Sequence, residues 1–215
     1  MVTNTQAIAD LQKRRLNEFR ESLPCVYRFF DRERFPRPKI ADRIIEEWQS
    51  LEEKHEGSPF ADCYRPGLIL FGESRKGKTQ LACELAKQAI KAHESQADAR
   101  FISAVEWAAE ASKKAKACDL DGWAHSLVKF AWRDDCDPGI IIIDDLDKLR
   151  CTAVVQSELF GLIEKITAND LRLIVTTNVS GDDLCKKFSS EFGSAIVSRL
   201  REFCVPVDFG MEGIP

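Results

Sequence analysis

The sequence has few residues of the kinds that build metal centres, secretion signals or membrane spans. Its three histidines, His55, His93 and His125, are scattered, and no two of its eight cysteines are separated by only two to four residues. Zinc sites need such short spacings, so we expect reduced thiols and no structural zinc. No apolar stretch reaches the roughly 20 residues that span a bilayer, and the first 15 residues lack the apolar centre of a secretion signal. We therefore expect a cytoplasmic protein.

An excess of positive charge is also missing. The formal net charge is -4 and the pI is about 5.6, which differs from the basic character of a constitutive nucleic-acid binder. Any contact with DNA must therefore come from a local patch. With 215 residues, of which 44% are hydrophobic and 31% charged, the chain has the composition of a globular protein with one sizeable domain and an appendage.

One short motif breaks an apolar run with glycines and charges. Residues 69–79 read ILFGESRKGKT, and the spacing of Gly72, Gly77, Lys78 and Thr79 matches the phosphate-binding P-loop. In such a loop, backbone N–H groups surround the phosphates, the lysine reaches the terminal ones and the hydroxyl binds magnesium. We therefore predict that ATP and Mg²⁺ bind here. The residues expected to surround the nucleotide are Gly72, Glu73, Ser74, Arg75, Lys76, Gly77, Lys78 and Thr79.

A pair of acidic residues follows the most apolar segment of the chain. The stretch 140–149, IIIIDDLDKL, begins with four isoleucines, which predict a strand buried on both faces. Ligand-binding residues of open α/β sheets gather at the carboxyl ends of strands. We assign Asp144 to magnesium binding and Asp145 to polarising the attacking water. Asp147 and Lys148 are interpreted as a solvated turn.

Two later residues are candidates for a catalytic role. Asn178 ends the segment VTTN, where its amide is positioned to orient the water or contact the γ-phosphate; an ordinary turn asparagine is the alternative. Arg199, in AIVSRLREF, precedes the last expected strand. Arginine stabilises charge on a transferred phosphoryl group and can come from a neighbouring subunit, whereas the alternative is a solvated helix arginine.

The order of these segments predicts the fold class. From residue 66 onward, five short strand patterns alternate with helical patterns, which is typical of an α/β fold with a parallel five-stranded sheet sandwiched by helices. Residues 1–60 differ, because they contain two amphipathic helical patterns joined by a proline-punctuated segment. This N-terminal extension either packs on the core, residues 61–215, or docks on a partner.

Taken together, GESRKGKT, IIIIDDLDKL, LIVTTN and AIVSRL resemble the motifs of AAA+ ATPases, and within them the DnaC/IstB-like group of bacterial helicase loaders and transposition helpers. The resemblance covers about residues 66–210. It implies a P-loop NTPase fold and a nucleotide-dependent homo-oligomer in which Arg199 reaches the ATP of the adjacent subunit. It also implies that one ATP is served by Lys78, Thr79, Asp144, Asp145 and Asn178.

The sequence departs from the AAA+ pattern in two places. Many members carry glutamate where this chain has Asp145, and the shorter side chain leads us to expect slow, partner-stimulated hydrolysis. The sequence ends at Pro215, shortly after the last expected strand, so we expect no C-terminal helical lid. The loader group shares this second feature.

The resemblance leaves the biological role open among three alternatives. The first is a DNA-replication accessory factor that assembles on DNA or on a replicative helicase. The second is a helper that delivers a transposase, and the third is a nucleotide-gated adaptor with little turnover. In the loader group, the region corresponding to 112–135 contacts single-stranded DNA. Here it combines Lys113, Lys114 and Lys116 with Trp123 and Trp132, which suits either DNA binding or a solvated lysine face over core tryptophans.

Overall fold

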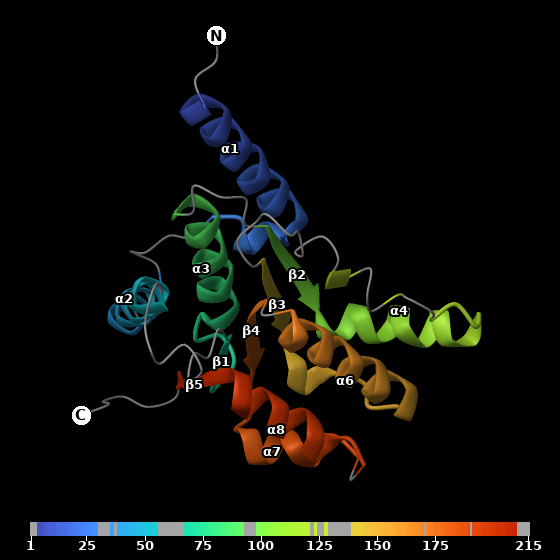
Figure 1. The fold of residues 1–215 in the computed structure, drawn as a ribbon. Coiled ribbons are helices and arrows are strands. Elements are labelled where there is room, and N and C mark those ends of the chain that lie inside the picture. The colour runs from blue at the N-terminus through green and yellow to red at the C-terminus, as the bar shows by residue number, and fades with distance from the viewer. Residues whose placement is uncertain are drawn as a thin grey trace.

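The computed structural model describes residues 4–29, 35–36, 38–55, 67–92, 98–120, 123, 127–128, 139–169, 171–189 and 191–209. These residues form one five-stranded sheet in which all neighbouring strands run parallel (Figure 1). The spatial order is β2-β3-β4-β1-β5. The strands are β1 Gly67–Phe71, β2 Ala99–Ser103, β3 Ile140–Asp144, β4 Arg172–Thr177 and β5 Cys204–Asp208. The predicted parallel five-stranded sheet is confirmed.

Helices cover both faces of this sheet (Figure 1). The 3-10 turn η1 spans Cys25–Tyr27, and η3 spans Leu146–Lys148 directly after β3. In the described ranges, no helix is both long and apolar enough to cross a membrane. The α-helices are α1 Asn4–Ser22, α2 Pro38–His55, α3 Lys78–Ala92, α4 Ala104–Lys116, α6 Ala153–Ala168, α7 Gly181–Lys187 and α8 Gly193–Phe203.

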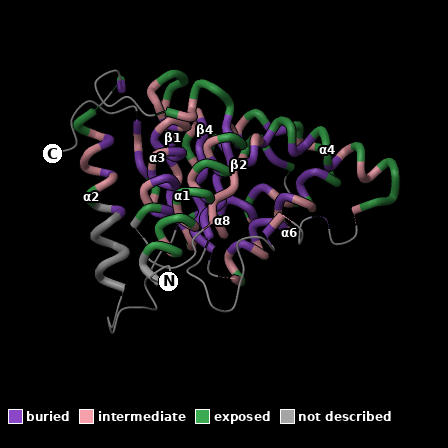
Figure 2. Tube along the Cα trace, turned by 90° about the horizontal axis from the view of Figure 1, so that it is seen from above, coloured by how far each residue is buried: buried purple, intermediate pink, exposed green. Residues whose placement is uncertain are grey.

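The isoleucine strand β3 lies at the centre of the core. Ile141 and Ile143 belong to the buried cluster that includes residues of α4, α6 and α8, whereas Ile140 and Ile142 belong to the cluster under α1, α2 and α3. Alternate residues of a strand face opposite sides of the sheet, so four consecutive isoleucines supply apolar contacts to both layers. Figure 2 shows buried residues concentrated on the sheet and on the helix faces that cover it. The prediction of a strand buried on both faces is confirmed.

The N-terminal extension shares a core with the sheet. Phe19 and Leu23 are buried in the same cluster as Leu81 and Leu85 of α3. The buried guanidinium of Arg15 in α1 also forms an ion pair, 3.4 Å long, with Asp98, the residue before β2. The described part of the extension therefore packs on the core, which is one of the two alternatives that the sequence left open. A role in docking a partner stays a prediction.

Two of the described cysteines belong to the apolar core. The six that lie in the described ranges carry free thiols, and two of them, Cys83 and Cys204, are buried among apolar residues. Burial raises the pKa of the Cys83 thiol to about 12, so it stays protonated at neutral pH. Cys83 and Cys204 therefore act as small core residues.

The shared core leads to a prediction about stability. Phe19→Ala removes a ring that is 3% exposed, and we expect the free energy of unfolding in urea to fall by about 3–5 kcal/mol. Phe29, which is 75% exposed in the same extension, is the matched control, and Phe29→Ala should change stability by less than about 0.5 kcal/mol. Equal stability of the two variants would contradict a shared core.

Candidate nucleotide-binding site

The loop between β1 and α3 needs its two motif glycines. Gly72 and Gly77 have φ angles of 128° and 90°, in the region that favours glycine. At Gly77 a side chain is excluded for a second reason, because a Cβ atom there would clash with the ring of Phe35. The Gly77 carbonyl accepts a hydrogen bond from Leu81 N–H (2.9 Å), so the loop leads directly into α3. The N-terminus of a helix attracts phosphate through its free N–H groups and its dipole.

Lys78 connects this loop to the end of β4. Its ammonium donates hydrogen bonds to the carbonyl oxygens of Gly72 and Glu73, both at 2.7 Å, and to Asn178 Oδ1 at 3.1 Å. The side chain is 5% exposed, and burial lowers the pKa of Lys78. Two residues that are 100 positions apart in the sequence therefore meet at one point.

The predicted magnesium ligands are also in contact. Thr79 Oγ1 donates to Asp144 Oδ1 at 2.6 Å, and Thr176 Oγ1 donates to the same oxygen at 2.6 Å. Burial raises the pKa of Asp144, and the two hydroxyl hydrogen bonds oppose that rise. Hydroxyl and carboxylate oxygens are ligands that Mg²⁺ prefers, so this donor set fits the ion.

The acidic turn after β3 makes side-chain contacts that the sequence did not suggest. Asp147 accepts hydrogen bonds from the backbone N–H of Asn178 (2.8 Å) and from its side-chain amide (3.1 Å and 3.2 Å). Lys148 Nζ lies 2.5 Å from Asp145 Oδ2, and this hydrogen bond raises the pKa of Lys148. The interpretation of Asp147 and Lys148 as a solvated turn is therefore incomplete, because Lys148 is exposed and Asp147 partly buried, yet both contact candidate catalytic residues.

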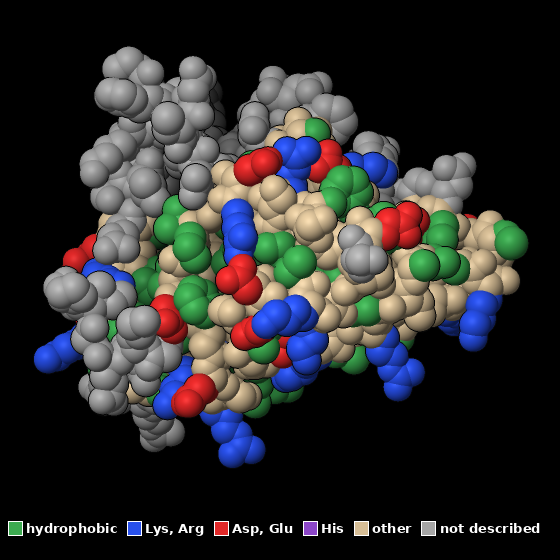
Figure 3. Space-filling view, turned by 90° about the horizontal axis from the view of Figure 1, so that it is seen from below, with side chains coloured by type: hydrophobic (Ala, Val, Ile, Leu, Met, Phe, Trp, Pro, Cys, Tyr) green, Lys and Arg blue, Asp and Glu red, His purple; other side chains and the backbone are tan. Residues whose placement is uncertain are grey.

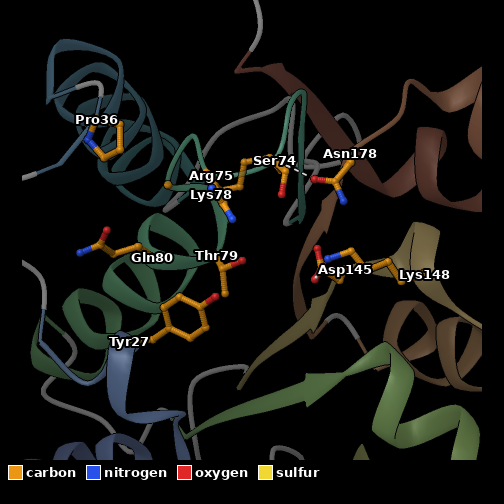
Figure 4. Close-up of a pocket in the computed structure, with 11 residues that line it drawn as sticks. Tyr27, Pro36, Ser74, Arg75, Lys78, Thr79, Gln80, Asp145, Lys148 and Asn178 are labelled. Carbon is orange, nitrogen blue, oxygen red and sulfur yellow. Dashed lines mark hydrogen bonds and ion pairs between the residues drawn. The ribbon is translucent and has the colours of Figure 1, made fainter.

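These residues surround a cavity of about 290 Å³ at the carboxyl end of the sheet (Figure 4). Asp144 lies behind Thr79, while Gly72, Glu73 and Lys76 belong to the loop without lining the cavity. The predicted residues that line it are Ser74, Arg75, Gly77, Lys78, Thr79, Asp145 and Asn178. The residues that sequence reasoning missed are Tyr27, Pro36, Gln80 and Lys148.

Tyr27 brings the N-terminal extension into the site. Its phenol faces Thr79, and burial raises the pKa of this phenol (Figure 4). The backbone carbonyl of Tyr27 accepts a hydrogen bond of 2.9 Å from Lys87, whose side chain is fully buried under the extension. The ring also packs against Phe101 of β2, with 6.3 Å between the two ring centroids. No local motif around Tyr27 indicated this position.

Arg199 lies away from the cavity of its own chain. On α8, its guanidinium donates to Glu164 of α6 at 2.5 Å and to Glu202 at 2.9 Å. Figure 3 shows basic and acidic side chains intermingled on the face that carries α7 and α8. The geometry does not bring Arg199 to the site within one chain, so its predicted catalytic role requires a second subunit.

The predicted DNA-contacting region is only partly described. Trp123 is buried and stacks on Trp107 with 5.5 Å between ring centroids, so it is a core residue. Lys114, in the last turn of α4, forms a 3.1 Å ion pair with Asp119. Trp132 lies outside the described residues. The lysines of α4 stay the remaining candidates for contact with a nucleic acid.

Comparison with solved structures gives relatives of the same fold. A proposed primosome component from Streptococcus pyogenes has a TM-score of 0.60 and 18% identity, over 91% of this chain and 95% of that one. The DnaC helicase loader has a TM-score of 0.54 and 16% identity, over 74% and 86%. AMPPCP-bound DnaA from Aquifex aeolicus has a TM-score of 0.55 and 17% identity, over 77% of this chain but 46% of that one, so the chain spans about half its length.

The sequence itself decides the family. No curated protein matches the chain in sequence. The profile of the ATPase family associated with various cellular activities (AAA), however, matches residues 68–200. This range is more than half of the chain and contains the P-loop, Asp144 at the end of β3, Asn178 directly after β4, and Arg199. The chain belongs to the AAA family of ATPases.

Proposed function

We propose that this protein binds and hydrolyses ATP with Mg²⁺ and acts as an accessory factor of DNA replication, in the manner of a helicase loader. The observation that carries the ATPase part is the meeting of Lys78, Thr79, Asp144 and Asn178 at one end of the sheet. These residues come from three separate elements. A solved structure of the same fold, DnaA from Aquifex aeolicus, is bound to the ATP analogue AMPPCP.

Each of these side chains has a distinct chemical task. The Lys78 ammonium neutralises the terminal phosphates, and Thr79 with Asp144 would hold Mg²⁺. Magnesium, when bound, supplies positive charge to the phosphate oxygens. Asp145 accepts a proton from the attacking water, and Asn178 orients that water. Asp147 keeps Asn178 in place through three hydrogen bonds.

The replication role rests on the solved structures with this fold. Two of them, the DnaC helicase loader and the proposed primosome component, are matched over most of their own length. We propose slow hydrolysis because Asp145 is shorter than glutamate and is paired with Lys148. We further propose a homo-oligomer and a replicative helicase as partner, with single-stranded DNA as a second ligand near α4.

The first test concerns nucleotide binding. Lys78→Ala should weaken binding of a non-hydrolysable ATP analogue by at least about 100-fold, because the buried ammonium that serves the phosphates is lost. Calorimetry measures the affinity, and circular dichroism checks the fold. Lys91→Ala, an exposed change on the same helix, is the matched control and should bind normally. Unchanged binding in Lys78→Ala would rule out the loop as a phosphate site.

The second test concerns the replication partner. Phosphate release by the full chain should rise when a replicative helicase from the same cell or an oligo-dT strand is added, if the proposed role couples hydrolysis to either target. Lys78→Ala should show no release under either condition. Stimulation by a transposase alone would instead support the transposition helper. No stimulation by any of them would support the nucleotide-gated adaptor.

The third test concerns Arg199 and assembly. Arg199→Ala should bind the analogue with near-parental affinity yet hydrolyse ATP poorly, because the lost charge matters at a boundary between subunits. Mixing it with Lys78→Ala should restore part of the activity, since a hybrid interface combines an intact pocket with an intact arginine. Co-assembly of the two variants is checked by pull-down with different tags. Absence of rescue in co-assembled mixtures would exclude a role in trans.

A further inference from the structure

Asp145, the proposed base, is held by contacts on both its backbone and its side chain. Its backbone has a φ of 56° and a ψ of 47°, the left-handed conformation that is uncommon for residues other than glycine and that aspartate adopts more readily than most. The Asp145 N–H donates to Thr176 Oγ1 at 2.9 Å, and Thr176 is fully buried. Thr176 also donates to Asp144, so one hydroxyl fixes both acidic residues. The position of the Asp145 backbone is therefore fixed against β4.

Lys148 meets this carboxylate because of the turn that follows. The Lys148 N–H donates to the Asp145 carbonyl at 2.9 Å and closes the 3-10 turn η3. The turn places the lysine side chain beside Asp145, with Nζ 2.5 Å from Oδ2. Both side chains line the cavity (Figure 4). The contact therefore lies inside the site and follows from local backbone geometry.

An ion pair of this kind opposes the chemistry assigned to Asp145. A general base must offer a carboxylate lone pair to a water molecule. An ammonium that donates a hydrogen bond to the carboxylate occupies one of its lone pairs, so that lone pair is not available to a water molecule. Lysine is also a flexible point charge, so the pair can open without movement of the backbone.

We propose that Lys148 is a positioning residue that restrains Asp145 and so sets a low basal rate of ATP hydrolysis. The proposal rests on the ATPase function proposed above and adds a regulatory element to that site. Opening of the pair releases the carboxylate to the water. The competing role, in which Lys148 contacts the γ-phosphate and accelerates the reaction, predicts the opposite effect of removing its charge.

The test uses the full chain with Lys148→Met, which keeps most of the length of the side chain and removes the charge. We expect kcat for phosphate release to rise about tenfold, a part of the contribution that a general base makes. The affinity for AMPPCP, measured by calorimetry, should stay within about twofold, as expected for a residue that acts on the base and not on the bound nucleotide. Lys148→Arg, which keeps the charge, should not show this rise in kcat.

Two controls make the result specific. Lys186→Met removes another ion pair between residues three apart, Lys186 with Asp183 at 2.7 Å, outside the residues that line the cavity, and should change neither kcat nor affinity. The double variant Asp145→Asn with Lys148→Met should hydrolyse no faster than Asp145→Asn alone. A gain that persists without Asp145 would overturn the proposal, because Lys148 would then act through another group.

The remaining outcomes also test the proposed restraint of Asp145 by Lys148. A fall in kcat, or a loss of AMPPCP affinity, in Lys148→Met would assign the lysine to the phosphates and overturn the restraint. An unchanged kcat would show that the pair does not limit the base. If the parental protein failed to bind AMPPCP, the proposed ATPase function itself would fail. If it bound without turnover, Lys148→Met should still start phosphate release.

Discussion

The buried carboxylate of Asp144 is the constraint on which the site depends. It ends the isoleucine strand β3, is 8% exposed and has hydroxyl partners from α3 and from β4. Burying an unpartnered charge is costly, so the helix after the P-loop and the neighbouring strand must both be placed where their hydroxyl groups reach the end of β3. The pairing of Ile143 with Val175 brings Thr176 beside Asp144. The pairing of β3 with β4, the position of the P-loop and the metal donors therefore depend on the hydrogen bonds that this carboxylate accepts.

A second constraint joins the N-terminal extension to the site. The buried ammonium of Lys87 must find an acceptor, and the Tyr27 carbonyl supplies it. This contact holds η1 against α3 and places the Tyr27 phenol at Thr79. The boundary at residue 60 that the sequence suggested therefore separates residues that share one buried cluster and one cavity wall. Changes in the extension and changes at the nucleotide are physically connected.

Much of the fold could be predicted because its signals are local. Four adjacent isoleucines, the glycine spacing of the P-loop and the alternation of strand and helix patterns each depend on neighbouring residues. The parallel sheet and its two covering layers follow from them. Arg199 shows where this reasoning ends, because its helix was expected, whereas its partners Glu164 and Glu202 depend on how α8 packs on α6.

The sequence by itself determined the loop, the acidic pair at the end of β3 and the succession of strands and helices along the chain, since short-range patterns encode these features. Only the tertiary structure decided that Thr176 ties Asp144 to Asp145, that Asp147 holds Asn178 and that Tyr27 lines the cavity. The strand register and the packing of α1 on α3 create these contacts, which join residues 31 to 52 positions apart. Contacts between side chains so far apart have no local pattern, because they arise only when separate elements are brought together by burial of their apolar faces.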